Sequence, residues 1–192
     1  MSLKQKAIKG VIWSAVESWG GRIISVSIFF LLARLLDPKS FGLVALASVF
    51  IDFVQIFIDQ GFSQAINQRE DLEPEHLNSA FWINLGIGIL LTIFTLGFAD
   101  IIANGFSQPG LAPIIRWLSL GFLLSSLSKV QEAILQRQLD FKALASRSLL
   151  ASVISGLVGV VMAFMGWGVW SLVTKLLVFG SVQTILVWWV SD

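Results

Sequence analysis

Residues 80–99 read AFWINLGIGILLTIFTLGFA, twenty residues without a charged side chain. A helix of this length rises about 30 Å, which matches the hydrocarbon thickness of a bilayer. Five other segments have the same apolar character. The six predicted spans lie at about 10–33, 41–63, 80–99, 113–131, 144–165 and 167–189. The sequence therefore predicts an all-α integral membrane protein, with residues 1–192 forming one six-helix transmembrane bundle.

The composition of the chain excludes several functional classes. Of 192 residues, 56% are hydrophobic and 13% are charged, whereas soluble domains carry about 25% charged residues. The absence of cysteine and the single histidine exclude disulfide scaffolds and clusters of cysteine or histidine around a metal. The net charge of +1 gives no strong attraction to nucleic acid. No catalytic triad, phosphate-binding loop or cofactor motif is present, so we do not expect an enzyme.

Proline and glycine mark the predicted connections between spans. All four prolines, Pro38, Pro74, Pro109 and Pro113, fall in predicted loops or at a helix start, because proline disrupts helix interiors. The fifth and sixth spans are separated only by a short segment near Gly166. We therefore expect these two spans to form an antiparallel hairpin.

Basic residues predict the orientation in the membrane. Seven of them precede the first span or lie in the loops after the second and fourth spans: Lys4, Lys6, Lys9, Arg69, Arg137, Lys142 and Arg147. The loop after the first span holds only Arg34 and Lys39. Because basic loops stay in the cytoplasm, we expect a cytoplasmic N-terminus.

Two of the predicted spans carry a polar face. At 100° per residue, six polar or small residues of the first span fall within an arc of about 140°. These residues are Ser14, Glu17, Ser18, Gly21, Arg22 and Ser25. In the second span, Ser48, Asp52, Gln55 and Asp59 follow spacings of 4, 3 and 4 residues and so share one stripe.

Other polar residues lie singly inside the predicted spans. Asn84 lies in the third span, and Lys175 lies about a third of the way along the sixth. Charged side chains in mid-bilayer are costly and avoid lipid. Two interpretations remain open: the polar residues line a wet cavity, or they pair with one another and fix helix packing.

The fifth span carries a row of small residues. Ser148, Ser152, Ser155, Gly159 and Ala163 share one face. Small residues at this spacing let membrane helices approach closely. We therefore predict that this face serves helix packing.

Several stretches resemble a known transporter family. LARLLDP at 32–38 followed by FGL at 41–43 resembles the opening hairpin of the polysaccharide transporter family, the Wzx-like flippases of the multidrug/oligosaccharidyl-lipid/polysaccharide exporter superfamily. DQGFSQAI at 59–66 is similar to that family's second span and following loop, and residues 131–141 resemble its fourth–fifth loop.

The resemblance implies a fold and an activity. Such proteins flip undecaprenyl-diphosphate-linked oligosaccharides across the bacterial inner membrane for lipopolysaccharide, capsule or exopolysaccharide assembly. They have two six-helix lobes around a central cavity and work by alternating access. Residues 1–192 would then form the N-terminal lobe of a longer transporter. Expected partners are the lipid-linked oligosaccharide, membrane lipids and the glycan polymerase or export machinery.

A diphosphate–sugar headgroup needs a wet, partly cationic path, because bare hydrocarbon would leave its charge unsolvated. In such a cavity, we expect the residues of the polar faces to have three roles. Arg22 and Lys175 attract the diphosphate; Ser14, Ser18, Gln55 and Asn84 bind sugar hydroxyls; Glu17 and Asp52 bind a coupling proton or cation or hold the basic residues.

Two other functions remain open. A cation-coupled multidrug exporter of the same superfamily would suit the acidic residues of the second span, but Arg22 and Lys175 would repel cationic drugs. A non-transporting scaffold for glycan assembly would tolerate joint replacement of Arg22, Glu17 and Asp52. The molecule that accumulates in cells lacking the protein distinguishes the two transporters.

Overall fold

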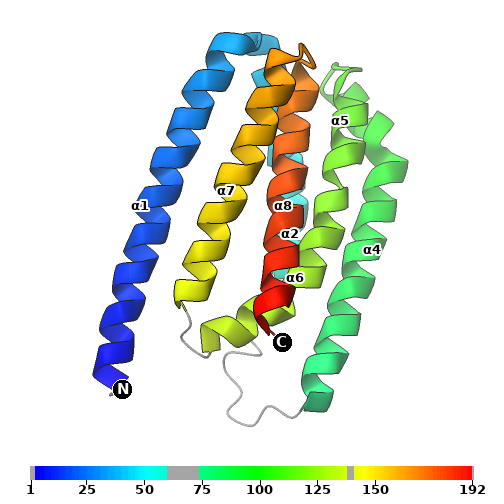
Figure 1. Ribbon diagram of the computed structural model, residues 1–192. Coiled ribbons are helices and arrows are strands. Elements are labelled where there is room, and N and C mark those ends of the chain that lie inside the picture. The colour runs from blue at the N-terminus through cyan, green and yellow to red at the C-terminus, as the bar shows by residue number, and fades with distance from the viewer. Residues whose placement is uncertain (1–2, 60–73, 138–140, 192) are drawn as a thin grey trace.

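The structure, a computed structural model, describes residues 3–59, 74–137 and 141–191. The described residues form seven helices: α1 (Leu3–Leu35), α2 (Pro38–Asp59), α4 (Pro74–Gly105), α5 (Leu111–Leu118), α6 (Leu120–Arg137), α7 (Phe141–Phe164) and α8 (Val169–Ser191). They stand side by side as a bundle (Figure 1).

The six predicted spans are confirmed. The segments long and apolar enough to cross a membrane are Trp13–Leu35, Pro38–Ile56, Asn78–Gly105, Leu111–Gln136, Lys142–Phe164 and Val169–Trp189. The third of these extends further at its C-terminal end than the predicted 80–99. Residues 60–63 of the predicted second span lie outside the described residues.

The fourth span differs from its prediction, because it is divided at Ser119 into α5 and α6. The Ser119 hydroxyl donates to the Arg116 carbonyl at 2.7 Å. The Ser119 carbonyl accepts from Thr92 Oγ1 of α4 at 3.2 Å. Serine hydroxyls compete with the helix for backbone hydrogen bonds, and the bond from Thr92 holds the interrupted turn against α4.

The predicted hairpin of the last two spans is confirmed. α7 and α8 pack along each other and are joined by a turn in which Gly166 has φ +80° and Gly168 has φ +53°. Side chains other than glycine rarely adopt these angles. The Trp167 amide donates to the Met162 carbonyl at 3.1 Å and closes the end of α7.

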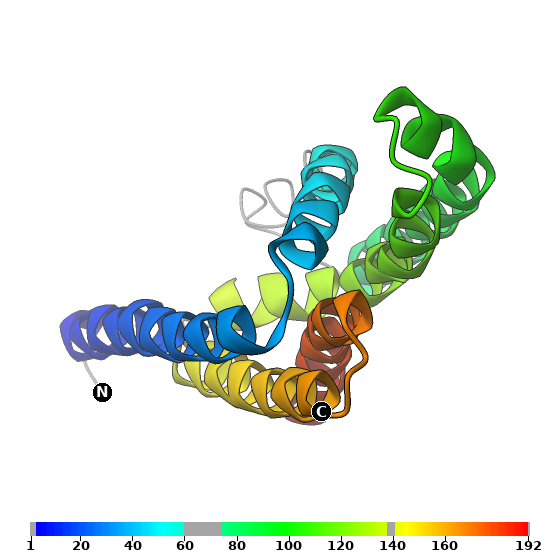
Figure 2. The same ribbon diagram turned by 90° about the horizontal axis from the view of Figure 1, so that it is seen from above.

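The helices form a row with one helix set apart from it. α1 packs on α7, α7 on α8, α8 on α6 and α6 on α4. α2 lies on one side of this row and contacts α5 and α8 (Figure 2). Although α1 and α2 are consecutive, they make little contact with each other.

The main core lies at the end of the bundle that carries the α1–α2 and α7–α8 connections, which we call the loop end. Buried side chains from six helices meet there, among them Leu32, Ala47, Ala99, Ala103, Leu111, Ile114, Ile115, Ala163 and Val173. The two chain termini lie at the opposite end, the termini end (Figure 1). The core thus joins α1 and α2 at one end only.

The span formed by α5 and α6 is the most buried of the six, whereas the span in α1 is the most exposed. Three side chains of neighbouring helices donate to backbone carbonyls of α6: Thr184 to Leu124 at 3.0 Å, Asn84 to Ser126 at 3.2 Å and Trp188 to Leu127 at 3.0 Å. Such bonds satisfy polar groups that lipid cannot.

Candidate functional site

The polar face of α1 includes Phe29, which contacts α2 near the loop end. The rings of Phe29 in α1 and Phe41 in α2 are in edge contact, with centroids 5.5 Å apart. Arg22 and Ser25 precede Phe29 by seven and four residues and therefore share its face of α1. Asp52 follows Phe41 by eleven residues and shares its face of α2. The aromatic pair therefore joins these faces near the loop end, and the polar residues lie beyond it toward the termini end.

The side chains on these faces are accessible. Ser18, Arg22 and Asp52 are exposed, and Ser14 is half-buried. Neither Arg22 nor Asp52 has a hydrogen bond or ion pair with another residue of the described part of the chain. The side chain of Glu17 lies outside the described residues. Among the described residues, Arg22 and Asp52 therefore offer one cation and one carboxylate that could meet a ligand or a coupling ion.

A polar groove opens between α1, α7 and α8. Its volume is about 190 Å³, and its lining residues are Ser25, Ile28, Ser152, Ser155, Lys175, Leu176 and Phe179. Lys175 lies six residues into α8, about 9 Å along the helix at 1.5 Å per residue. Within the described residues, its ammonium has no hydrogen bond or ion pair. Its three N–H groups are therefore available to an anion.

The row of small residues on α7 positions this lysine. A Cβ at Gly159 would lie 3.0 Å from the Lys175 Cβ and 3.4 Å from the Ser171 carbonyl oxygen. The missing side chain lets α7 approach α8 closely, and the packing prediction is confirmed at this position. The sequence-based interpretation missed the other role of the row, because Ser152 and Ser155 also line the groove.

The groove offers both hydroxyls and a cation. Ser152 donates to the Ser148 carbonyl at 2.9 Å, and Ser155 donates to the Ser152 carbonyl at 3.3 Å. Their hydroxyl oxygens keep lone pairs that can accept from a ligand hydroxyl. Together with Lys175, this lining suits a ligand that carries both negative charge and hydroxyl groups.

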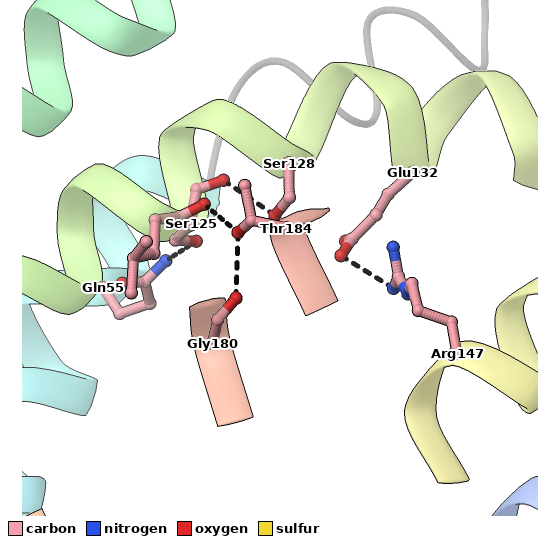
Figure 3. Close-up of polar contacts among 8 residues, drawn as sticks. Gln55, Ser125, Ser128, Glu132, Arg147, Gly180 and Thr184 are labelled. Carbon is pink, nitrogen blue, oxygen red and sulfur yellow. Dashed lines mark hydrogen bonds and ion pairs between the residues drawn. The ribbon is translucent and has the colours of Figure 1, made fainter. Parts of the chain in front are cut away.

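Two predicted site residues lie elsewhere. Asn84 is 1% exposed, and its amide donates to the Ser126 carbonyl of α6 at 3.2 Å. The amide of Gln55 donates to Ser125 Oγ at 2.6 Å and ties α2 to α6 (Figure 3). The sequence did not predict these helix–helix contacts, because helical periodicity gives a residue's face but not the neighbour that the face meets.

A second polar contact joins α6 to α7 toward the termini end. Arg147 Nη2 lies 2.9 Å from Glu132 Oε1 (Figure 3), and the two side chains are only 9% and 18% exposed. Arg147 Nε and Nη1 are buried without a hydrogen-bond partner in the part of the chain that the structure describes. The sequence places both residues near a predicted loop and gives no sign that they pair.

No group of three or more histidine, cysteine, aspartate or glutamate side chains within the described ranges could hold a metal ion. Taken together, the fold and the groove define a multi-pass membrane protein whose apolar helices enclose polar, charged surface. The chain belongs to the family described as "Polysaccharide biosynthesis protein", which matches residues 31–192. The polysaccharide transporter resemblance of the sequence is thereby confirmed.

Curated relatives share this assignment. The chain is 31% identical over 144 residues to the lipopolysaccharide biosynthesis protein WzxC of Escherichia coli K12, covering 73% of this chain and 29% of that protein. It is 29% identical over 178 residues to the succinoglycan biosynthesis transport protein ExoT of Rhizobium meliloti, covering 91% and 35%. It is 27% identical over 187 residues to the teichuronic acid biosynthesis protein TuaB of Bacillus subtilis, covering 97% and 39%. The chain thus spans about a third of the length of these relatives, and no solved structure matches it.

Proposed function

We propose that this chain forms the N-terminal lobe of a transporter that flips undecaprenyl-diphosphate-linked oligosaccharide across the bacterial inner membrane for polysaccharide biosynthesis. Membership of the family supports a role in polysaccharide biosynthesis. The observation that carries the proposal is the groove between α1, α7 and α8, in which Lys175 and serine hydroxyls lie inside an otherwise apolar bundle.

The chemistry of this groove fits a diphosphate–sugar headgroup. A diphosphate in bare hydrocarbon would lose its solvation, and so would the sugar hydroxyls. In the groove, Lys175 supplies positive charge, and Ser25, Ser152 and Ser155 supply hydroxyls. Outside it, along the polar face of α1, Arg22 adds positive charge, and Ser14 and Ser18 add hydroxyls. Glu17 and Asp52 bind a coupling cation or hold the basic residues when the substrate is absent.

The arrangement of α1 and α2 supports an alternating-access mechanism. We assign a cytoplasmic N-terminus from the distribution of basic residues, so that the loop end faces outward. The contact of Phe29 with Phe41 and the core around Ile115 then close the outer end. Since α1 and α2 make little contact, the polar faces between them would be reached from the cytoplasm, where the lipid-linked substrate is made.

The test uses the protein that carries this chain, expressed in bacteria lacking their own copy. Lys175→Ala and Arg22→Ala should each abolish surface polysaccharide and cause lipid-linked oligosaccharide to accumulate, at unchanged protein abundance. Arg34→Ala is the matched control, because Arg34 is an exposed base near the end of the same helix, α1. It should export normally.

Other outcomes of this test contradict the proposal. Normal export by both variants, at normal abundance, would remove the groove from the mechanism. Accumulation of an organic cation instead of lipid-linked glycan would indicate the multidrug exporter. Normal export after joint replacement of Arg22, Glu17 and Asp52 would indicate the scaffold.

A further inference from the structure

A second groove lies directly behind the polar one. It also runs between α1 and α7, has a volume of about 260 Å³ and is lined almost entirely by hydrocarbon. Ile23, Leu31 and Leu157 on its rim are 64%, 50% and 61% exposed. Exposed apolar side chains at this depth of a membrane-spanning bundle face lipid tails. This groove, which we call the tail groove, is therefore open to the bilayer.

One side chain separates the tail groove from the polar groove. Ile28 lines both of them. Its side chain rests on Gly156 of α7, where an added Cβ would overlap the Ile28 Cδ1 atom. Ile28, a flexible aliphatic side chain seated on a glycine, thus borders both a lipid-facing apolar surface and a cationic, hydroxyl-rich surface.

This juxtaposition matches the chemistry of an amphiphile. A lipid with an anionic head and a long hydrocarbon tail must keep the two parts in different surroundings, because the head needs charge and hydrogen bonds while the tail loses nothing in lipid. Across the α1–α7 seam, Lys175 lies on one side of Ile28 and Leu157 on the other.

We propose that the α1–α7 seam binds the isoprenoid tail of the substrate: the diphosphate lies at Lys175, the tail leaves the bundle past Ile28, and its first isoprene units lie in the tail groove. This inference rests on the proposed function and adds the tail site to it. The small volume of the tail groove admits only a short part of the tail, and the remainder stays in the bilayer.

The experiment measures binding of undecaprenyl diphosphate, and separately of inorganic diphosphate, to the purified full protein in detergent. Leu157→Trp fills the tail groove with a larger ring, and Val153→Trp does so from the preceding turn of α7. Both residues are exposed, so folding is preserved. Val161→Trp is the matched control, because Val161 is 56% exposed on the same helix but does not line the groove.

We expect both tail-groove variants to raise the Kd for undecaprenyl diphosphate about tenfold, because the added ring removes van der Waals contacts between the tail and the groove. Val161→Trp should bind like the original protein, and none of the three should change binding of inorganic diphosphate. A tenfold excess of phosphatidylglycerol should not displace undecaprenyl diphosphate, which excludes a general anionic-lipid site.

The failures of the two proposals are distinguishable. Loss of diphosphate binding in Lys175→Met, with equal undecaprenyl diphosphate affinity in all three tryptophan variants, overturns the tail site and leaves the headgroup site intact. Displacement by phosphatidylglycerol also overturns the tail site. Unchanged binding in Lys175→Met, or no binding of undecaprenyl diphosphate by the original protein, overturns both.

Discussion

The ion pair between Glu132 and Arg147 shows how burial decides what a charge contributes. The two side chains are 18% and 9% exposed, whereas Asp100 and Arg116, which also pair, are 64% and 44% exposed. An exposed pair contributes at most about 1 kcal/mol, because water and salt already solvate both charges. Removing one partner of a buried pair leaves an uncompensated charge and costs about 3–5 kcal/mol.

We therefore predict that Glu132→Gln lowers the free energy of unfolding by about 3 kcal/mol. Asp100→Asn, the matched control, should lower it by less than about 1 kcal/mol. Thermal unfolding of the purified protein in detergent measures both changes. Equal effects would mean that water reaches Arg147 and that the buried pair does not hold α6 against α7.

Two glycines in α4 make a second test at the residue scale. A Cβ at Gly88 would lie 2.5 Å from Ser126 Oγ and 3.1 Å from the Phe122 carbonyl oxygen, while a Cβ at Gly86 would meet nothing within 4 Å. Gly88 is therefore the point at which α4 and α6 approach each other, and Gly86 lies on an open face.

Gly88→Ala should lower the free energy of unfolding by about 1–3 kcal/mol through overpacking. Gly86→Ala should leave it unchanged or raise it by up to about 1 kcal/mol, because alanine favours the helix. Unfolding by a chaotropic denaturant in detergent separates the two. If Gly86→Ala lowered the free energy of unfolding and Gly88→Ala did not, the prediction that α4 approaches α6 at Gly88 would be wrong.

Among the helices, α6 is held to its neighbours by side chains that donate hydrogen bonds to its backbone carbonyls. The Thr184 hydroxyl of α8 lies 3.0 Å from the Leu124 carbonyl oxygen of α6 and 2.9 Å from the Gly180 carbonyl oxygen of its own helix, so these two acceptors share its single proton. Ser181, one turn earlier, bonds only within its helix, to the Leu177 carbonyl at 2.8 Å. The bond from Thr184 to Leu124 therefore joins α8 to α6, whereas the bond from Ser181 stays within α8.

Thr184→Val keeps the shape of the side chain and removes the bond between α8 and α6. We expect it to lower the free energy of unfolding by about 1 kcal/mol. Ser181→Ala should change it by less than about 0.5 kcal/mol, because its hydroxyl bonds only within α8. The same unfolding assay measures both, and a larger effect at Ser181 would contradict the central role of α6.

At the scale of the whole molecule, the two faces of α1 meet different surroundings. Ser18 lies on the polar face that turns toward α2, whereas Ile23 is 64% exposed on the rim of the tail groove. Both side chains are accessible in the isolated bundle. Only the first should meet water in a membrane.

Cysteine labelling tests this difference without background, because the chain contains no cysteine. Ser18→Cys should react with a membrane-impermeant maleimide in inside-out vesicles, since a thiol needs water to ionise and react. Ile23→Cys should react at least about tenfold more slowly in lipid. If Ser18→Cys were labelled only in intact cells, the assigned orientation would be reversed. If both variants were labelled equally fast, the prediction that water reaches only the polar face of α1 would be wrong.

The spans and their polar faces can be predicted from the amino-acid sequence. Twenty-residue apolar runs such as 80–99 can satisfy their backbone only as helices in a bilayer, and the periodicity of 3.6 residues fixes which side chains share a face. The same periodicity predicted the packing role of Gly159, and the short connection at Gly166 predicted the hairpin. The family resemblance rests instead on local motifs such as LARLLDP at 32–38.

The contacts between these faces depend on how the helices pack in three dimensions. Asn84 reached α6, Ser152 and Ser155 lined a groove as well as an interface, and Ser119 interrupted a span that reads as continuous. The groove at Lys175 depends on contacts among α1, α7 and α8, which lie far apart in the sequence. Periodicity within one helix is local, whereas the choice of neighbours depends on packing over the whole bundle.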